Sequence, residues 1–462
     1  MEKLTLNIAE LSLIPAAIVV KGESKQVFNK VVIDSRKAAE NCLFVAIKGD
    51  NFDGHDFIKD VIKSGAVGIV IDKSRIKEFE NLNTSIIAVD DTIIAFGQIA
   101  KLWRKKLNAK VISITGSNGK TSTKEYLSTM LSTIYNVVKT EGNNNNHIGV
   151  PLTILEADEK TEMLVLEHGT NHFNEISYTA AIAQPDFGLI TNIGDSHLEF
   201  LMDKNGVLEE KYALIEETIK NDGYVFINLD DKLITKKAKS IPNKISFSFS
   251  KDADVRGKVL GTDKKGRTEL WISFRNTVLE CSLPIYGNAN AKNVLAAVSI
   301  AQMLGLSKKD IYSGIKNLQS IKGRTQVSEL KKYFLIDDTY NANPDSMKAA
   351  LQLVSKVTFT TKKVAIIGDM FELGEESENL HKEVAQAIRK SDLTDLILVG
   401  TKTELIANEL KNSSVKVNYF TEKEKIYKFL DESNLVNSVI LVKGSRGMRM
   451  EEFVNYLKER GN

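Results

Sequence analysis

The chain is poor in the features that mark several classes of protein. Its 462 residues include only two cysteines, Cys42 and Cys281, which lie far apart and in no spacing typical of a metal site. We therefore expect neither a disulfide framework nor a cysteine-bound metal, and we predict a reduced protein of the cytoplasm. The sequence contains no internal repeat, and its asparagine run at 143–146 is too short to count as a low-complexity tract.

An excess of one charge and a long apolar run are also missing. The 62 basic and 60 acidic residues give a net charge of +2, so any phosphate binding must be local rather than spread over a basic surface. The N-terminal apolar patch is interrupted by Glu10 and Pro15, is too short to span a membrane, and lacks the order of a signal peptide. These absences predict a soluble protein that binds neither nucleic acid nor a membrane.

Short apolar runs alternate with helix-like stretches along the chain, and its length favours about three domains. Strands separated by helices predict parallel sheets that are covered on both faces. A segment from about 253 to 286 breaks this rhythm and is expected to form a β-hairpin appendage. After Gly323 the alternation resembles a doubly wound, dinucleotide-fold-like sheet. The sequence therefore predicts an α/β protein with domains at 1–105, 106–322 and 323–462.

A glycine-rich loop between a predicted strand and a predicted helix is the first sign of nucleotide binding. In such a turn the backbone N–H groups and the helix N-terminus converge on an anion. Lys120 would reach the β- and γ-phosphates, and Thr121 would bind Mg²⁺. The pattern is shorter than the usual phosphate loop, because Ile114 stands where a glycine is expected. The alternative is an ordinary turn with a solvated lysine. The predicted ATP-binding residues here are Gly116, Ser117, Asn118, Gly119, Lys120, Thr121 and Ser122.

Several longer segments make the chain resemble the Mur ligase family. EGNNNNHIGVPLTIL, EHGTNHFNEI and TNIGDSHLEF resemble the G-N-x-N-N-x-I-G-x-P, E-x-G-x-N-x-x-x-E-I and N-x-x-x-x-H-L-E segments of that family. IDSRKAAENCLFVAIKGDNFDGHDFI looks like its uridine-nucleotide-binding domain. IDDTYNANPDSMKAAL, GDMFELG and VKGSRGMRME look like the members that add D-alanyl-D-alanine. The resemblance thus covers all three predicted domains.

The resemblance implies both an architecture and a reaction. It implies a small N-terminal α/β domain that binds UDP, a central phosphate-loop domain with a parallel sheet, and a C-terminal Rossmann-like domain. The implied enzyme is an ATP-dependent ligase that joins D-alanyl-D-alanine to UDP-N-acetylmuramoyl-tripeptide, a precursor of peptidoglycan. ATP would first convert the substrate carboxylate to an acyl phosphate, and the amine would then displace phosphate.

A magnesium site is also implied by the resemblance. Glu167 ends the run LVLE and His197 follows the run LITNI, so both are expected at the carboxyl edge of a parallel sheet beside the phosphate loop. Together with Thr121 they would hold two Mg²⁺ ions that neutralise the γ-phosphoryl group. The alternatives are a solvated glutamate at a strand end and a packed or capping histidine.

Lys211 follows the motif histidine at the place where family members carry a lysine that CO₂ converts to a carbamate, which can bridge metal ions. A lysine reacts only as the neutral amine, so burial or nearby cations must lower its pKa. Ala213 stands where the family usually has a glutamate. The alternative is a solvated lysine paired with glutamates along its helix. With Lys120, Glu167 and His197, Lys211 completes the predicted catalytic residues.

Two asparagines and an arginine are the candidates for the adenine end of ATP. Asn290 and Asn293 lie in a segment that resembles the adenine-contacting one of the family, although Ala289 replaces its histidine. Amide groups suit the adenine edge, while helix capping is the alternative for Asn290. Arg324 resembles a phosphate-sensing arginine at a domain junction, and a solvated arginine at a hinge is the alternative.

The remaining candidates follow strands or lie in polar loops. By resemblance, Asp338 and Asn341 approach the ribose and adenine once the C-terminal domain closes, although D-x-x-N-x-N-P is also a good turn and helix start. The candidates for the amine substrate are Tyr340, Asn343, Lys443, Ser445 and Arg446. The candidates for the UDP substrate are Ser35, Arg36, Lys48, Gly49, Asn143 and Asn146.

Three other functions fit parts of this pattern. The ligase that adds the third peptide residue and a folylpolyglutamate-type synthetase are related enzymes, but IDDTYNANPDSM favours the dipeptide-adding type, and no D-N-P-R segment is present. A nucleotide-gated switch that uses the phosphate loop for binding or assembly is an alternative of another class. We further expect the enzyme to be a monomer.

Overall fold

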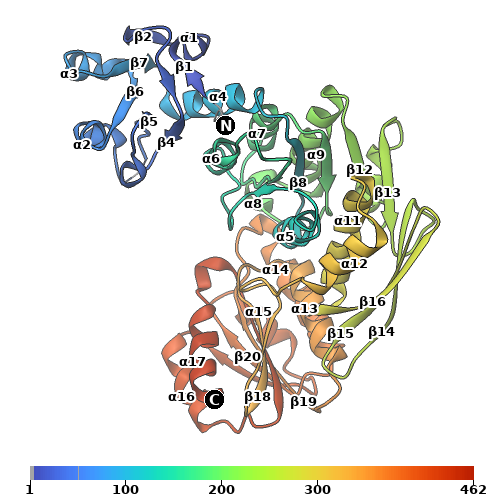
Figure 1. The fold of residues 1–462 in the computed structure, drawn as a ribbon. Helices are drawn as coiled ribbons and strands as arrows, with labels where there is room; N and C mark the ends of the chain where they lie inside the picture. The colour runs from blue at the N-terminus through green and yellow to red at the C-terminus, as the bar shows by residue number, and fades with distance from the viewer. Residues whose placement is uncertain (1–4, 50) are drawn as a thin grey trace.

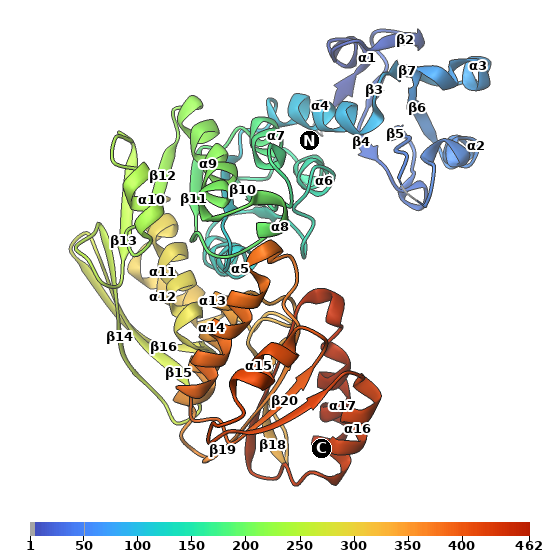
Figure 2. The same ribbon diagram turned by 180° about the vertical axis from the view of Figure 1, so that it is seen from behind.

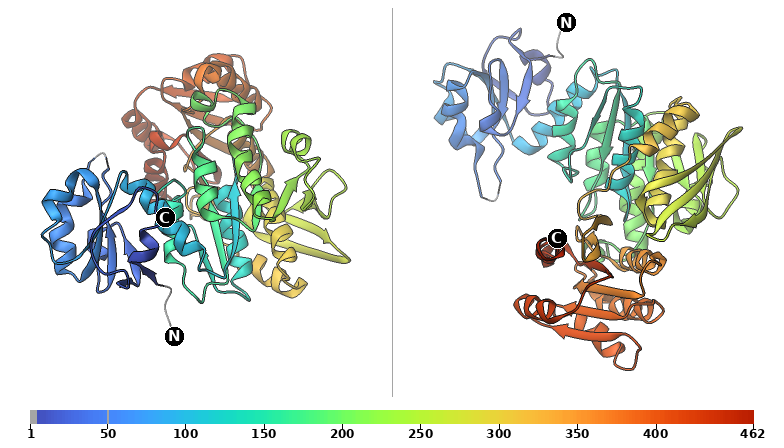
Figure 3. Two further views of the ribbon diagram at one scale, coloured as in Figure 1. Left: turned by 90° about the horizontal axis from the view of Figure 1, so that it is seen from above. Right: turned by 60° about the horizontal axis from the view of Figure 1, so that its bottom comes forward.

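Three large β-sheets, one in each third of the chain, organise the computed structural model, which describes residues 5–49 and 51–462 (Figure 1). The N-terminal and C-terminal parts each lie against the central part and stand apart from one another in Figures 1 and 2. Figure 3 shows the same three bodies from two further directions. The predicted α/β class is confirmed, while the boundaries near 105 and 322 stay predictions.

The N-terminal part contains a five-stranded sheet in the order β2-β7-β6-β5-β4, in which only β2 runs antiparallel to its neighbour. Its strands are β2 (Ile18–Lys21), β4 (Lys30–Val32), β5 (Cys42–Val45), β6 (Ala66–Asp72) and β7 (Ser85–Val89). Its helices are α1 (Ile8–Leu11), α2 (Ile58–Lys63) and α3 (Ile76–Phe79), and β1 (Leu6–Asn7) pairs with β3 (Val27–Phe28). The apolar runs KVVID, CLFVAIKG, GAVGIVI and SIIAVD of the sequence form β4, β5, β6 and β7, and β2 adds a strand at one edge.

The central part is built on a nine-stranded sheet in the order β16-β15-β14-β13-β12-β11-β8-β10-β9. Its strands are β8 (Lys110–Thr115), β9 (Val137–Lys139), β10 (Met163–Glu167), β11 (Phe187–Ile190), β12 (Tyr224–Asn228), β13 (Lys244–Ser248), β14 (Val255–Thr262), β15 (Arg267–Phe274) and β16 (Thr277–Tyr286). Its helices are α5 (Lys120–Leu131), α6 (Gly149–Glu156), α7 (Glu175–Ala183), α8 (Leu198–Leu201), α9 (Lys204–Lys220), α10 (Lys232–Lys237), α11 (Asn288–Met303) and α12 (Lys308–Lys316). The strands from β9 to β14 pair in parallel.

The prediction that residues 253–286 form a separate β-hairpin appendage is wrong. β14, β15 and β16 form a three-stranded antiparallel meander, and β14 also pairs in parallel with β13, so the segment continues the central sheet instead of standing apart. Alternating apolar residues of β15, such as Leu270 and Ile272, are buried in the same core as helices α5 and α11. The meander therefore shares the central core. The alternation of apolar and polar residues along its strands predicts one buried face, but it does not show what covers that face.

The C-terminal part has a six-stranded sheet in the order β17-β18-β22-β19-β20-β21, parallel except for β17. Its strands are β17 (Gln326–Glu329), β18 (Tyr333–Asp338), β19 (Lys362–Gly368), β20 (Asp395–Val399), β21 (Lys416–Phe420) and β22 (Ser438–Lys443). Its helices are α13 (Pro344–Lys356), α14 (Ser377–Arg389), α15 (Thr403–Glu409), α16 (Lys423–Glu432) and α17 (Glu451–Gly461). One apolar cluster joins α13 to α15 with one face of the sheet, and another joins α16 and α17 with the opposite face. The sheet is thus covered on both sides, as buried parallel strands require.

The helix α4 (Thr92–Arg104) connects the N-terminal part to the central part (Figure 1). Its Trp103 is buried and donates its indole N–H to the carbonyl of Ala157 at 2.9 Å. Arg104 donates to the carbonyl of Ala183 at 2.9 Å. One apolar cluster runs from the N-terminal sheet through α4 to α6 and the central strands, so the two parts share a core. Among the described residues, every helix falls short of the length and apolar character that a membrane span requires.

Candidate active site

The phosphate loop joins the carboxyl end of β8 to the first turn of α5. Gly116 and Gly119 have φ angles of 146° and 84°, which favour glycine. A Cβ on Gly116 would lie 1.9 Å from Thr191 Oγ1, and one on Gly119 would lie 2.3 Å from Asn293 Oδ1. The two glycines therefore allow the loop to fit closely between the end of β11 and the start of α11. The loop placement matches the strand-loop-helix order read from the sequence.

Lys120 folds back over this loop. Its Nζ donates to the carbonyl of Gly116 at 2.7 Å. The pKa of Lys120 is lowered to about 8, chiefly by burial; the carboxylate of Glu167 opposes this shift and the charge of Arg324 adds to it. The lysine thus lies beside the backbone N–H groups of the loop, where the charge of a phosphate would favour its protonated form.

Glu167 ends β10 and is only 1% exposed. Its Oε1 accepts hydrogen bonds from Thr121 Oγ1 at 3.1 Å and from Asn145 Nδ2 at 2.8 Å. Its Oε2 lies 3.6 Å from Lys124 Nζ and has no hydrogen bond to any residue within 5–49 and 51–462. A buried carboxylate oxygen without a donor is costly, and a hard cation is a ligand that suits it. The fold brings Thr121 and Glu167 together, and their role as metal ligands stays a prediction.

Lys124 and Asn145 are two site residues that the sequence reasoning missed. Lys124 is fully buried, and its Nζ donates to the carbonyls of Thr140 and Gly142 at 2.5 and 3.1 Å. It therefore connects α5 to the start of the asparagine loop, residues 140–146. One turn of helix separates it from Lys120, a spacing that could have identified it. Asn145 carried no such signal, because four consecutive asparagines look alike in the sequence.

Lys211 lies on α9 and is 1% exposed. Burial lowers its pKa well below the usual value, the charge of Lys120 lowers it further, and Glu210 opposes this shift. This burial shows that the solvated lysine of the alternative interpretation is wrong. Glu210 instead accepts the backbone N–H of Asn174 at 2.6 Å and that of Ile176 at 2.8 Å. Lys211 is thus a buried amine near Lys120, with its neutral form favoured.

His197 follows β11 and begins α8 with a φ of 55°. The neighbouring Ser196 donates to Ser117 Oγ of the phosphate loop at 2.9 Å, which places this backbone beside the loop. The ring points to the C-terminal part, with Nδ1 2.7 Å from Glu372 Oε2. Neither here nor elsewhere among the described residues do three His, Cys, Asp or Glu side chains gather into a group that could hold a metal ion. A site at Glu167 and His197 would therefore need other ligands, such as Thr121 or phosphate oxygens.

The C-terminal part contacts the phosphate loop directly. Asn343 caps α13, and its Nδ2 donates to Asn118 Oδ1 at 3.0 Å. The loop is thereby held from both sides, because Asn118 N–H also donates to Asn192 Oδ1 at 3.0 Å. Asn343 was predicted for the amine substrate, but its amide is used for capping and for this bridge. The D-x-x-N-x-N-P segment therefore does form the helix start that its pattern allows.

A buried ion pair organises the other C-terminal candidates. Lys443, 1% exposed, contacts Asp338 Oδ2 at 2.6 Å and donates to the carbonyl of Asn341 at 3.0 Å. Asn341 Oδ1 accepts the backbone N–H of Arg446 at 3.3 Å, and Ser445 Oγ accepts that of Phe371 at 2.8 Å. The turns after β18 and β22 are therefore joined into one polar cluster. The substrate roles of these side chains stay predictions.

At the adenine end, Asn290 has its polar atoms occupied. Its Nδ2 donates to the carbonyl of Tyr286 and to Thr325 Oγ1, both at 2.9 Å, and its Oδ1 accepts from Tyr126 at 3.0 Å. Asn290 therefore makes structural contacts within α11 and its surroundings, but it is not the helix cap of the alternative, because Gly287 is the N-cap of α11. Asn293, in contrast, lies directly against Gly119 of the phosphate loop.

Arg324 stacks on a neighbouring ring. Its guanidinium carbon lies 3.8 Å from the centre of the Tyr340 ring. The charge of Arg324 also lowers the pKa of Lys120, so the arginine is close to the phosphate loop. The alternative of a solvated arginine at a hinge is therefore not favoured, and binding of phosphate by Arg324 stays a prediction.

The candidates for the UDP substrate lie apart from this cluster. Ser35 and Arg36 begin a short 3₁₀ helix in the N-terminal part, and the exposed Arg36 side chain pairs with Asp34 at 2.8 Å. This hydrogen-bonded contact lowers the pKa of Asp34 to about 2. Lys48 and Gly49 lie in the loop after β5. Among the described residues, no hydrogen bond or ion pair joins these four candidates to the phosphate loop.

The asparagine loop contributes structural contacts as well. Asn146 Oδ1 accepts the backbone N–H of Gly149 at 2.9 Å and so caps the first turn of α6. The carbonyl of Asn143 accepts the backbone N–H of Asn145 at 2.7 Å, while the Asn143 side chain is exposed. Binding of the UDP substrate by Asn143 and Asn146 stays a prediction.

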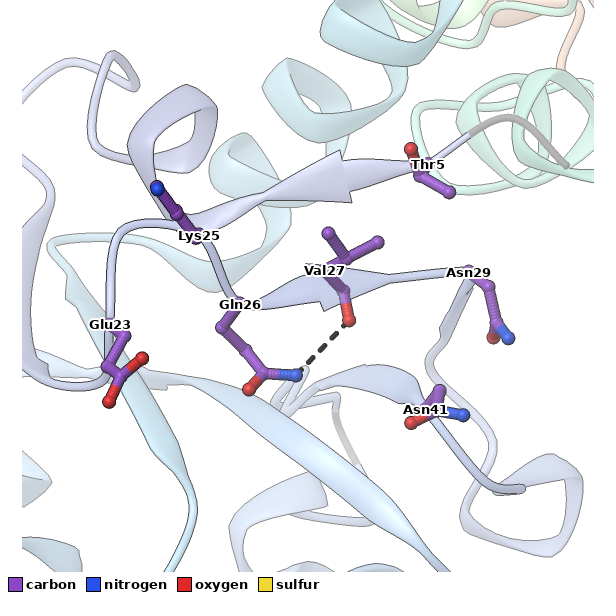
Figure 4. Close-up of a pocket in the computed structure, with 7 residues that line it drawn as sticks. All are labelled: Thr5, Glu23, Lys25, Gln26, Val27, Asn29 and Asn41. Carbon is purple, nitrogen blue, oxygen red and sulfur yellow. Dashed lines mark hydrogen bonds between the residues drawn. The ribbon is translucent and has the colours of Figure 1, made fainter. Parts of the chain in front are cut away.

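A surface hollow in the N-terminal part is a separate feature. It is lined by Thr5, Glu23, Lys25, Gln26, Val27, Asn29 and Asn41. Figure 4 shows these side chains spread around β3, with a single hydrogen bond from Gln26 Nε2 to the carbonyl of Val27. None of the predicted site residues lines this hollow, so the chemistry is assigned to the phosphate loop.

Comparison with known proteins settles the family. In order along the chain, 27–104 match the model "Mur ligase family, catalytic domain", 114–301 match "Mur ligase middle domain", and 323–446 match "Mur ligase, glutamate ligase domain". A Bacillus subtilis protein named UDP-N-acetylmuramoyl-tripeptide--D-alanyl-D-alanine ligase is 35% identical over 456 residues, which cover 98% of each chain. The chain belongs to the Mur ligase family.

Other members support this assignment in sequence and in structure. The Escherichia coli protein of the same name is 33% identical over 439 residues, covering 93% of this Mur ligase and 94% of its own chain. A crystal structure of MurF from Acinetobacter baumannii has a TM-score of 0.86 at 29% identity and covers 98% and 99% of the two chains. That of the Thermotoga maritima MurF ligase in complex with ADP has a TM-score of 0.82 at 28% identity, covering 93% and 97%. The three-domain Mur ligase architecture is thereby confirmed.

His168, next to Glu167, gives this Mur ligase a predictable response to acid. The ring is fully buried between Ser113 and Thr179, each 2.9 Å from one ring nitrogen, and burial lowers the pKa of His168 to about 3. In the unfolded state His168 binds a proton below about pH 6.5, whereas in the folded state it stays neutral down to about pH 3. The free energy of unfolding is therefore highest above pH 6.5 and decreases as the pH falls. At pH 5 the loss is about 2 kcal/mol relative to pH 8.

We expect His168→Gln to flatten this dependence, measured as the urea midpoint between pH 5 and pH 8. His172→Gln is the matched control, because the His172 side chain is 62% exposed. An equal pH dependence in the wild type and in His168→Gln would contradict the assignment.

Proposed function

We propose that the chain is an ATP-dependent ligase that joins D-alanyl-D-alanine to UDP-N-acetylmuramoyl-tripeptide and releases ADP and phosphate. The observation that carries this proposal is the full-length similarity to ligases of that name. In addition, Thr121 of the phosphate loop lies 3.1 Å from the buried carboxylate of Glu167. The product is the pentapeptide precursor of peptidoglycan, which gives the enzyme its place in cell-wall synthesis.

The reaction has two steps that balance in atoms and charge. A carboxylate oxygen of the tripeptide attacks the γ-phosphorus of ATP, ADP leaves, and an acyl phosphate forms. The amine of D-alanyl-D-alanine then attacks the acyl carbon, phosphate leaves, and the nitrogen loses a proton to give the amide. Water must be excluded, because it would hydrolyse the acyl phosphate.

The chain supplies the groups that the first step needs. The N–H groups of the loop 116–121 bind the phosphates, and Lys120 neutralises charge on the transferred group. Arg324 and Asn293, which lie by the loop, contact the phosphate and adenine ends. Asn343 links the C-terminal part to the phosphate loop through Asn118. Asp338, paired with Lys443, would approach the ribose from the C-terminal part. Positioning of this kind can contribute about 7–11 kcal/mol to lowering a barrier.

Magnesium would be held by Thr121, Glu167 and His197. Oε2 of Glu167, buried, 3.6 Å from Lys124 Nζ and without a hydrogen-bond donor among the described residues, fits a cation. Bound Mg²⁺ would neutralise the triphosphate and polarise the γ-phosphoryl group. Lys211, whose neutral amine is favoured, would react with CO₂ to form a carbamate and so supply a further anionic ligand.

The two acceptor substrates approach from the two outer parts. Ser35, Arg36, Lys48 and Gly49, with Asn143 and Asn146, would bind the UDP-linked tripeptide. Tyr340, Lys443, Ser445 and Arg446 would bind the dipeptide near the turns after β18 and β22. A location in the cytoplasm is consistent with the free thiols of Cys42 and Cys281, and the monomeric state stays a prediction.

A substrate-dependence assay tests the proposed reaction. Phosphate release is measured with ATP and Mg²⁺ in the presence of the UDP-linked tripeptide, of D-alanyl-D-alanine, of both, or of neither. We expect sustained release only with both substrates, together with a pentapeptide product seen by mass spectrometry. Equal release in all four mixtures would identify a nucleotide switch and overturn the ligase.

Substitution of Lys211 tests the carbamate. We expect Lys211→Ala to lower turnover by at least about 100-fold, because it removes an anion beside the transferred phosphoryl group. Lys220→Ala, on the same helix at an exposed position, is the matched control. Removal of CO₂ should lower the wild-type rate and bicarbonate should restore it. Near-normal turnover of Lys211→Ala, with an unaltered circular dichroism spectrum, would exclude the role.

A further inference from the structure

The predicted metal ligand His197 is held from a different part of the chain. Its ring reaches out of the central part, and Nδ1 lies 2.7 Å from Oε2 of Glu372, in the loop after β19. Nδ1 has no hydrogen bond to any described residue. The contact is therefore a close pairing of imidazole and carboxylate.

The loop that carries Glu372 is fixed against the backbone around His197. The carbonyl of Glu372 accepts the N–H of Glu199 at 3.3 Å, and a Cβ on Gly374 would lie 3.3 Å from the Glu199 backbone. Leu373, 3% exposed, belongs to the same apolar cluster as Leu198. Apolar packing and a main-chain hydrogen bond therefore hold the His197 and Glu372 segments next to one another.

Both residues pay a conformational cost for this contact. His197 has a φ of 55° and Glu372 a φ of 62°, values that are unusual for residues with a side chain. Such backbone angles persist only where the surroundings hold them, and they cluster at functional sites. The strain is therefore consistent with a contact that serves the site rather than the fold alone.

The chemistry of a metal-bound histidine explains why a carboxylate would be placed here. When one ring nitrogen binds a metal, the other donates its N–H to a carboxylate or carbonyl, which fixes the tautomer and the orientation of the ring. With Nδ1 facing Glu372, the nitrogen left for a metal is Nε2. The carboxylate would also make the imidazole a stronger ligand.

We propose that Glu372 is a positioning residue for the active site: from the C-terminal part it orients the His197 ring so that Nε2 can bind Mg²⁺. This inference rests on the proposed metal-binding role of His197. Since the two residues belong to different parts of the chain, the magnesium site is complete only when the C-terminal part is docked. Metal binding and docking therefore favour each other, as linked equilibria must.

Binding of Mn²⁺ tests the inference without any turnover. The probe is Mn²⁺ added to the full-length protein with ADP, and free Mn²⁺ is followed by electron paramagnetic resonance. We expect Glu372→Ala to weaken His197-dependent Mn²⁺ binding by about 10–100-fold. Glu372→Gln should lose less, because its carbonyl can still accept the ring N–H. Binding of ADP without metal should be unchanged in both variants.

Two further variants separate the possible outcomes. Leu373→Ala weakens the apolar docking contact but keeps the carboxylate, so it should lose some Mn²⁺ affinity through the linkage to docking, but clearly less than Glu372→Ala. A loss in Leu373→Ala as large as in Glu372→Ala would show that the loop acts only through docking and would overturn the inference. If Glu372→Ala binds Mn²⁺ with wild-type affinity while His197→Ala clearly loses affinity, the inference about Glu372 is overturned but the proposed metal site is not. Wild-type affinity in His197→Ala would overturn the proposed metal site as well.

Discussion

The buried carboxylate of Glu167 is the interaction on which the rest of the site depends. A carboxylate that is 1% exposed must be compensated. The fold compensates one oxygen with Thr121 and Asn145 and leaves the other near Lys124, without a hydrogen bond to the described residues. The phosphate loop, the asparagine loop and β10 are thereby brought to one point at the carboxyl edge of the central sheet.

The C-terminal part completes this point from outside the central sheet. Asn343 reaches Asn118 of the phosphate loop, and Glu372 reaches His197. Both contacts come from loops that follow strands of the C-terminal sheet, which is where parallel sheets present polar side chains. The site therefore depends on the docking of two separately folded sheets. This dependence suits a reaction in which a reactive acyl phosphate must be shielded from water.

Much of this architecture could be predicted from the sequence, because parallel strands read as continuous apolar runs and the phosphate loop has its own glycine pattern. The runs that became β8, β10 and β11, the position of Glu167 at the end of β10 and the position of His197 in the loop after β11 follow from this rule. The joining of the meander β14–β16 to the main sheet could not be predicted, since alternating residues do not specify a neighbour. The contact between Glu372 and His197 is also invisible in sequence, because it joins residues of separate parts.

Several candidates gained a structural explanation that the sequence alone did not favour. Asn290 is bonded on all sides by Tyr126, Tyr286 and Thr325, so a role toward adenine would require that network to break. Lys211, in contrast, is buried where a solvated position was the simpler alternative. Helix periodicity places residues on a face but does not tell which face is covered, which explains both cases.

We infer that the active site assembles around a cation between Thr121, Glu167 and a bound triphosphate. A crystal structure with Mn²⁺ and a non-hydrolysable ATP analogue, with data collected for anomalous scattering, tests this claim. We expect an anomalous peak within coordination distance of Thr121 Oγ1 and Glu167 Oε2, with the phosphates on the N–H groups of 116–121. A peak distant from both side chains, or a nucleotide bound away from the loop, would contradict it.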